Sequence, residues 1–101
     1  MSITSTSVNN GHDLVISVTG RFDFNSLQSF RKAYENTAVK PKTYIVDLRE
    51  SDYLDSSALG MLLALRDHAG EEGAKIKIIN CNPDVKKILI ITKLDELFII
   101  E

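Results

Sequence analysis

The stretch TYIVDLRESDYLDSSALGMLLAL, residues 43–65, runs from a short apolar segment through a polar one into a long apolar block. The first segment predicts a strand over 43–50 that is buried on both faces, as strands of parallel sheets are. A polar loop follows it. Asp55, Ser56 and Ser57 then predict a helix start, because short polar side chains accept hydrogen bonds from the free amides of a first helical turn. A buried strand followed by a helix is a building unit of α/β sheets.

The segments on either side alternate between strand and helix patterns. Apolar residues at every second position predict strands, and a spacing of three or four predicts helices. These patterns predict strands over 3–9, 13–20, 74–80 and 97–100, and helices within 21–38, 55–73 and 82–97. Turn residues at 9–11 join the first two strands into a hairpin. The expected fold is α/β, a single sheet of mostly parallel strands with an N-terminal antiparallel edge hairpin and helices packed against it, in the order β-β-α-β-α-β-α-β.

Composition limits the kind of protein that this chain can be. Its 101 residues have the size of one compact domain, so we expect a single domain over 1–101. The net charge is −2 and the basic residues are scattered, which argues against nucleic acid as a partner. Cys81 is the only cysteine, which excludes an internal disulfide and a zinc site of several thiolates. The N-terminus is unlike a signal peptide and the longest apolar run, 61–65, is too short to span a membrane, so a soluble cytoplasmic protein is expected.

Three segments resemble a known family, the STAS domain of bacterial anti-sigma factor antagonists. VDLRESDYLDSSALGMLLAL (46–65) is similar to the family's hydrophobic strand, short loop and D-S-[ST]-[GA]-L-G helix start. VTGRFDFNS (18–26) resembles its GELD segment, and INCNPDVKKILIITKLDELFII (79–100) resembles its proline-started helix and last strand. The resemblance covers nearly the whole chain and implies a STAS-type sheet. The chain departs from the family at Ala58, where many members have glycine, and it ends where many members continue into one more helix.

The resemblance also implies how the protein acts. Family members are commonly non-enzymatic proteins that switch partners. The unphosphorylated antagonist, a monomer when free, binds an anti-sigma factor that is also a serine kinase of the GHKL type, and this binding frees the sigma factor. The kinase phosphorylates the antagonist, the complex dissociates, and a PP2C-type phosphatase restores the active form. For this protein itself we expect no cofactor, no metal site and no nucleic acid or membrane as a partner.

Motif alignment places the implied phosphorylation on Ser56, with Ser57 as the less favoured acceptor. Asp55 is the acid that precedes it. Asp23 matches the acid of the GELD segment, which lies near the phosphorylated serine in relatives. The predicted partner-binding residues are Asp23, Asp55, Ser56, Ser57, Ala58, Leu59 and Met61.

The residues by themselves leave other roles open. Ser56 could act only as a helix cap that accepts a hydrogen bond from an amide one turn further on. The apolar block 58–65 holds more apolar residues than one helix face needs, so its surplus is either core or an exposed partner surface. Gly60 costs helix stability, which close approach by a partner or by the sheet would explain. A STAS subunit could also scaffold a larger assembly or act on a partner unrelated to sigma factors.

Two chemical alternatives are disfavoured. A small serine hydrolase would need a base near Ser56, but the only histidines, His12 and His68, are distant in sequence and no G-x-S-x-G elbow is present. A magnesium site would have to use loop carboxylates, which are far more often solvated than bound to metal: Asp47, Glu50, Asp52 and Asp55.

Overall fold

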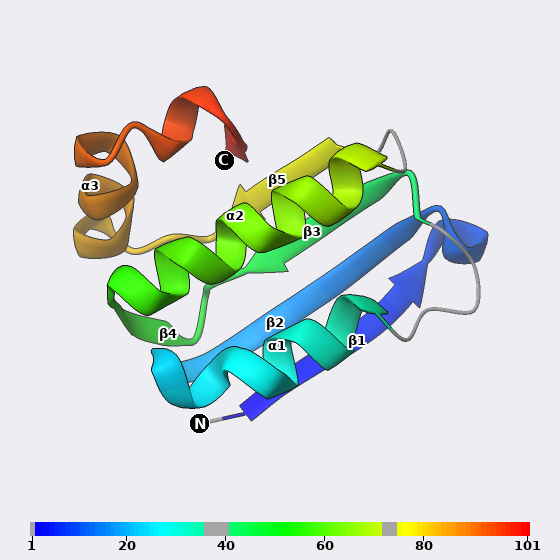
Figure 1. Cartoon of the computed structure of the whole chain (residues 1–101), viewed down its shortest axis with the longest axis horizontal. Helices are drawn as coiled ribbons and strands as arrows, with labels where there is room; N and C mark the ends of the chain where they lie inside the picture. The colour runs from blue at the N-terminus through cyan, green and yellow to red at the C-terminus, as the bar shows by residue number, and fades with distance from the viewer. Residues whose placement is uncertain (1, 36–40, 72–74) are drawn as a thin grey trace.

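The computed structural model describes residues 2–35, 41–71 and 75–101, which form an α/β fold (Figure 1). The strands are β1 (Ser2–Val8), β2 (Asp13–Phe22), β3 (Thr43–Asp47), β4 (Ser51–Leu54), β5 (Lys75–Ile79) and β6 (Ile99–Ile100). The helices are α1 (Leu27–Glu35), α2 (Ser56–Glu71) and α3 (Pro83–Ile91). Short 3-10 turns lie at η1 (Asn9–Gly11), η2 (Phe24–Ser26) and η3 (Leu94–Glu96). Figure 1 shows α1 and α2 side by side across one face of the sheet, with α3 near the end where β4 leads into α2.

Within the described residues, the strands form one six-stranded sheet in the order β1-β2-β3-β5-β6, and β4 pairs with β2 beyond the end of β3. β1 and β2 are antiparallel, and β1 is an edge strand, as predicted. The other strand pairs are parallel. The predicted fold class is therefore confirmed, with β4 added to the predicted order of elements.

β4 corrects the sequence prediction, which placed a polar loop between the strand over 43–50 and the helix start at Asp55. Ser51 is buried although it is polar, because its hydroxyl donates a hydrogen bond to the Gly20 carbonyl oxygen at 3.0 Å. Gly20 has a φ of 86°, and the register of the β2–β4 pair shifts directly after it. A four-residue strand with a buried hydroxyl carries no hydrophobic alternation, so the sequence pattern could not reveal it. Its pairing extends β2 to Phe22, beyond the predicted strand end at 20.

The hydrophobic core lies between the sheet and the helices. Leu14, Ile16 and Val18 point into it from β2, as their alternation predicted. The buried residues of α2 follow a spacing of three or four: Ala58, Met61, Leu62, Leu65 and Ala69. One face of α2 therefore belongs to the core, whereas Leu63 is 39% exposed.

β3 is buried more deeply on one face than on the other. Tyr44 and Val46 are fully buried, whereas Ile45 is only half-buried. The prediction that this strand is buried on both faces is wrong, because α1 and α2 cover the same face of the sheet (Figure 1).

The helices are shorter than their predicted segments. Arg21 and Phe22 belong to β2, and Leu27, the first residue of α1, is 42% exposed. α3 begins at Pro83, as the family's proline-started helix implied, and ends at Ile91, which is 68% exposed. Residues 36–38 and 72–74 of the predicted elements lie outside the described residues. Among the described residues, no helix is long and apolar enough to span a membrane.

A chain of aromatic rings joins α1, α2 and the sheet. Phe22 and Phe30 have ring centroids 5.0 Å apart, and Phe30 and Tyr34 are 5.8 Å apart. His68 packs between Tyr34 at 5.0 Å and Tyr44 at 6.1 Å. His68 thus contributes to helix packing, far along α2 from the helix start.

Candidate functional site

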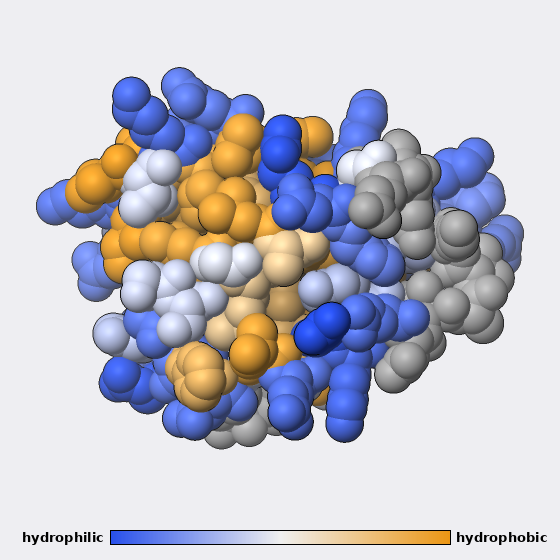
Figure 2. Space-filling model, in the orientation of Figure 1, coloured by the Kyte–Doolittle hydropathy of each residue, from blue (hydrophilic) through white to orange (hydrophobic). Residues whose placement is uncertain are grey.

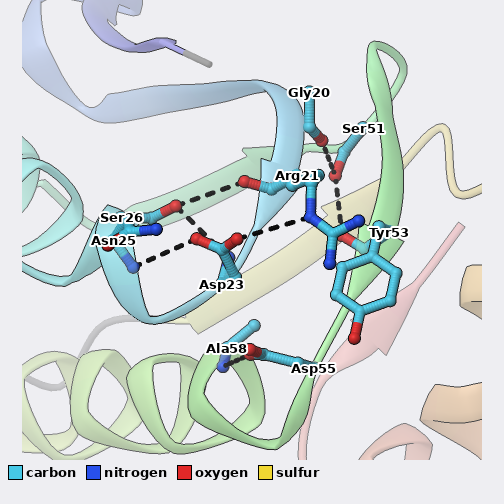
Figure 3. Close-up of polar contacts among 9 residues, drawn as sticks. All are labelled: Gly20, Arg21, Asp23, Asn25, Ser26, Ser51, Tyr53, Asp55 and Ala58. Carbon is cyan, nitrogen blue, oxygen red and sulfur yellow. Dashed lines mark hydrogen bonds and ion pairs between the residues drawn. The ribbon is translucent and has the colours of Figure 1, made fainter.

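The predicted site residues meet where β2 and β4 end side by side. Phe22 pairs with Leu54, and the Asp55 amide donates a hydrogen bond to the Phe22 carbonyl oxygen at 3.4 Å. The segment that carries Asp23 therefore adjoins the start of α2, as the sequence predicted. Figure 3 shows the Asp23 carboxylate between Asn25 and Arg21 and the Asp55 carboxylate directed at Ala58.

Asp55 caps α2. Its carboxylate accepts a hydrogen bond from the Ala58 amide at 2.9 Å, and its carbonyl oxygen accepts one from the Leu59 amide at 3.2 Å. Ser56 is the first residue of the helix and is exposed, and no hydrogen bond within the described part of the chain holds its hydroxyl. The capping role considered for Ser56 thus belongs to Asp55, because a cap residue must stand just outside the helix. Ser57 is half-buried.

Replacing the Asp55 carboxylate tests the cap. We expect Asp55→Ala to lower the free energy of unfolding by about 1 kcal/mol, because the Ala58 amide loses its acceptor. Asp55→Asn should retain most of that stability, since asparagine caps nearly as well. Urea unfolding followed by circular dichroism measures the difference. Asp52→Ala, an exposed acid three residues earlier, is the control, and an equal loss in both alanine variants would rule out the cap.

Asp23 closes the neighbouring turn. Its carboxylate accepts a hydrogen bond from the Asn25 amide at 3.0 Å. The Ser26 hydroxyl in return accepts one from the Asp23 amide at 3.3 Å and donates one to the Arg21 carbonyl oxygen at 3.3 Å. Asp23 thus caps a 3-10 turn that precedes α1.

Arg21 and Tyr53 complete the cluster, and the sequence did not point to either residue. The Arg21 Nε atom lies 3.5 Å from an Asp23 carboxylate oxygen, and the Arg21 Cζ atom lies 3.9 Å from the centroid of the Tyr53 ring (Figure 3). The two residues face each other because Arg21 pairs with Tyr53 across β2 and β4. Since β4 was not predicted, nothing in the sequence pattern could bring them together.

The structure buries two of the residues that were predicted to bind a partner. Ala58 is fully buried and Met61 is 4% exposed, so their side chains support the core and offer no surface to a partner. Leu59 is half-buried and packs against the core. The helical spacing of the apolar block explains this outcome, because one turn of α2 places Ala58 and Met61 toward the sheet. The accessible members of the set are Asp23, Asp55, Ser56, Ser57 and Leu59.

Gly60 lies on the solvent side of α2, one turn after Ser56. A Cβ atom built there would meet nothing within 4 Å, so the sheet does not require glycine at this position. Of the two explanations that the sequence left open for Gly60, close approach by the sheet is therefore wrong.

Exposed apolar side chains lie on the helices and on the C-terminal segment. Figure 2 shows apolar residues gathered over α3, α2 and the C-terminal segment, with a smaller group near the start of α1. The large exposed hydrophobic residues include Phe24, Leu27, Leu63, Ile90, Ile91, Leu97 and Ile99. A groove of about 820 Å³ runs between the C-terminal half of α2 and β6, where Ile76 and Leu97 lie among charged residues such as Arg66 and Lys75. Apolar patches of this kind are typical of binding surfaces.

The acidic side chains and the cysteine of the described residues are poorly suited to metal binding or thiol chemistry. Among the described residues, no three histidine, cysteine or acidic side chains are placed to hold a metal ion. The Asp47 carboxylate accepts hydrogen bonds from the Arg49 amide at 3.0 Å and from the Asn80 side chain at 3.1 Å. Burial raises the pKa of the Cys81 thiol, which keeps it in the less nucleophilic protonated form.

Comparison with known proteins gives a consistent result. A family model described as "Mlab, STAS domain" matches residues 5–101. The STAS-domain containing protein PA14_20770 of Pseudomonas aeruginosa is 55% identical over 98 residues, which cover 97% of each chain. Among solved structures, the Bacillus cell fate determinant SpoIIAA in its phosphorylated form matches with a TM-score of 0.71 at 17% identity, covering 99% of this chain and 91% of that one. A sulfate transporter family protein from Wolinella succinogenes matches with a TM-score of 0.78 at 12% identity, covering 90% of this chain and 79% of that one.

The two solved structures support the fold alone, because their sequence identities are low. The family model and the Pseudomonas relative extend over almost the whole chain and support the family as well. This chain therefore belongs to the STAS-domain family.

Proposed function

We propose that this protein is an anti-sigma factor antagonist that binds its partner while Ser56 is unphosphorylated and releases it when Ser56 is phosphorylated. The observation that carries this proposal is the position of Ser56. Its hydroxyl is exposed at the first residue of α2, and the neighbouring Asp55 caps the helix in its place. A kinase can therefore modify Ser56 without removing a hydrogen bond that the described fold uses. The SpoIIAA structure, whose name records a phosphorylated form, supports the proposal by analogy.

The proposed reaction is a phosphoryl transfer. A serine kinase of the GHKL type moves the γ-phosphoryl group of ATP to the Ser56 Oγ atom, the hydroxyl proton is released and ADP leaves. A PP2C-type phosphatase uses water to restore the hydroxyl and free inorganic phosphate. Because the donor is ATP, we place the protein in the cytoplasm. The start of α2 tolerates the added anion, since its free amides and helix dipole favour negative charge there.

The protein itself acts without catalysis in this proposal. The twelve residues from Ser56 to His68 correspond to about 18 Å along a helix, and His68 packs between tyrosine rings. His12 precedes β2, at the opposite end of that strand from the site. Neither histidine is placed to take the Ser56 proton, which disfavours a serine hydrolase.

A second candidate is a STAS subunit that acts on a partner unrelated to sigma factors. The groove beside β6 favours it, because this groove lies along the C-terminal half of α2, away from Ser56. A partner bound there would not meet a phosphate on Ser56. The fold shared with a sulfate transporter family protein is compatible with this second role.

Affinity capture from the native cell separates the two candidates. The baits are wild type, Ser56→Ala, Ser56→Asp and the control Ser29→Asp, which adds the same charge to an exposed serine of α1. We expect every bait except Ser56→Asp to retain an anti-sigma factor with a kinase-type ATPase domain, identified by mass spectrometry. Phosphosite mapping of the wild-type bait should find phosphate on Ser56. Equal capture by Ser56→Asp, or phosphate on Ser57 alone, would contradict the proposal.

A further inference from the structure

The guanidinium group of Arg21 has two contacts that hold it in place, but its two terminal nitrogens still have donors to offer. Its face packs on the Tyr53 ring, with Cζ 3.9 Å from the ring centroid. Its Nε atom reaches Asp23 at 3.5 Å, and its side chain is 63% exposed. Among the described residues, no hydrogen bond engages its two terminal nitrogens. Arg21 therefore presents a flat, oriented pair of donors to the solvent, which is the geometry that binds carboxylates and phosphates.

The contacts that hold Arg21 near Asp23 are easily exchanged. An exposed ion pair at this distance contributes little, because water screens it. The Asp23 carboxylate has a further partner in the Asn25 amide, so it remains bonded when Arg21 turns away. The Tyr53 ring can keep the guanidinium face while the donor edge points in another direction.

The strand pairing and the chain length limit how far Ser56 can lie from Arg21. Arg21 pairs with Tyr53, and neighbouring strands run about 4.8 Å apart. Ser56 follows Tyr53 by three residues, so their Cα atoms lie within about 11 Å of each other. The hydrogen bond from the Asp55 amide to the Phe22 carbonyl oxygen fixes the start of α2 against the residue that follows Arg21.

The charges around Ser56 determine which group a phosphate on Ser56 would attract. The acids Asp23, Asp52 and Asp55 stand in the segments beside Ser56, and Arg21 is the cation built into the strand pair between them. A phosphate adds a charge of about −1.5 to −2 and three strong acceptor oxygens. It attracts the guanidinium more strongly than a single carboxylate that is already hydrogen-bonded.

We infer that Arg21 is the residue that binds the phosphoryl group on Ser56, turning on the Tyr53 ring from Asp23 to the phosphate. This inference rests on the proposed phosphorylation of Ser56 and adds its structural consequence. The exchange would leave the Asp23 carboxylate without its cation, so phosphorylation would alter the surface at Asp23 as well as at Ser56. A partner that contacts either residue would then meet a changed charge pattern.

Titration of the phosphate by ³¹P NMR tests this inference. Phosphoserine is installed at position 56 during translation, in the full chain, so that the measurement needs no kinase. A nearby cation stabilises the dianion and lowers its pKa. We expect Arg21→Gln to raise the phosphate pKa by about 0.5–1 unit relative to wild type. Arg21→Lys, which keeps the charge but loses the flat fork, should recover only part of the wild-type value.

Arg31→Gln is the matched control. Arg31 is 66% exposed and forms an ion pair with Glu35 on α1, much as Arg21 does with Asp23. Its loss should leave the phosphate pKa unchanged. Equal phosphate pKa values in wild type and Arg21→Gln would overturn the inference. Failure to find Ser56 phosphorylated in cells would refute the proposed function instead, and the titration would still show whether Arg21 binds a phosphate there.

Discussion

Ser56→Asp is expected to weaken the complex with the anti-sigma partner by roughly a hundredfold or more, while Ser56→Ala preserves it. The unphosphorylated surface at the start of α2 is already acidic, with Asp52 exposed and Asp55 half-buried. A further negative charge faces a partner surface that is matched to a neutral hydroxyl. Like-charge contact across an interface costs several kcal/mol, and each 1.4 kcal/mol is a factor of ten in affinity.

Isothermal titration calorimetry with the captured partner measures this effect. Ser29→Asp serves as the control, because it adds the same charge on α1 and should bind like wild type. Ser57→Asp distinguishes the two candidate acceptors, since Ser57 is half-buried one residue further into α2. Equal affinities for wild type and Ser56→Asp would refute charge-controlled release. A loss confined to Ser57→Asp would move the switch to that residue.

The α/β fold could be predicted from the sequence because most of its strands and helices have a recognisable hydrophobic spacing or a start signal of their own. Leu14, Ile16 and Val18 alternate in β2, and Pro83 marks the start of α3. Each of these signals depends on residues that are close in sequence. The antiparallel β1–β2 hairpin was predictable for the same reason, since its turn residues lie between the two strands.

The candidate site was predictable only in part, because the positions of Arg21 and Tyr53 depend on the pairing of β2 with β4, and β4 has no hydrophobic alternation. The chain segment that carries Ser56 has a helix-start signal and a family motif, so Asp55 and Ser56 could be found from sequence. The contact between Arg21 and Tyr53 depends on β4. The buried position of Ser51 in β4 is polar, so the strand shows no hydrophobic alternation in the sequence. The sequence predicted Met61 as a partner-binding residue, whereas Met61 is 4% exposed, because a helix with more apolar residues than one face needs does not reveal which of them face the sheet.

The second large effect concerns the packing that holds this site together. We expect Phe22→Ala to lower the free energy of unfolding by about 3–5 kcal/mol. Phe22 is fully buried, and its ring packs 5.0 Å from that of Phe30. Truncation loses the burial of a large side chain and leaves a cavity between β2 and α1. Since small domains are stable by about 5–15 kcal/mol, this single change removes a large share of the total.

Phe24→Ala is the matched control for that measurement, because Phe24 is an aromatic residue two positions away that is 67% exposed. Its unfolding free energy should stay within about 0.5 kcal/mol of wild type in urea denaturation. Similar losses in both variants would mean that Phe22 is not the packing anchor. The comparison also bears on function, because the Phe22 backbone accepts the hydrogen bond from Asp55 that sets β2 against the start of α2. A folded Phe24→Ala variant that binds its partner less tightly would place Phe24 in the interface, and a Phe22→Ala variant that loses both properties would show that site geometry depends on this core contact.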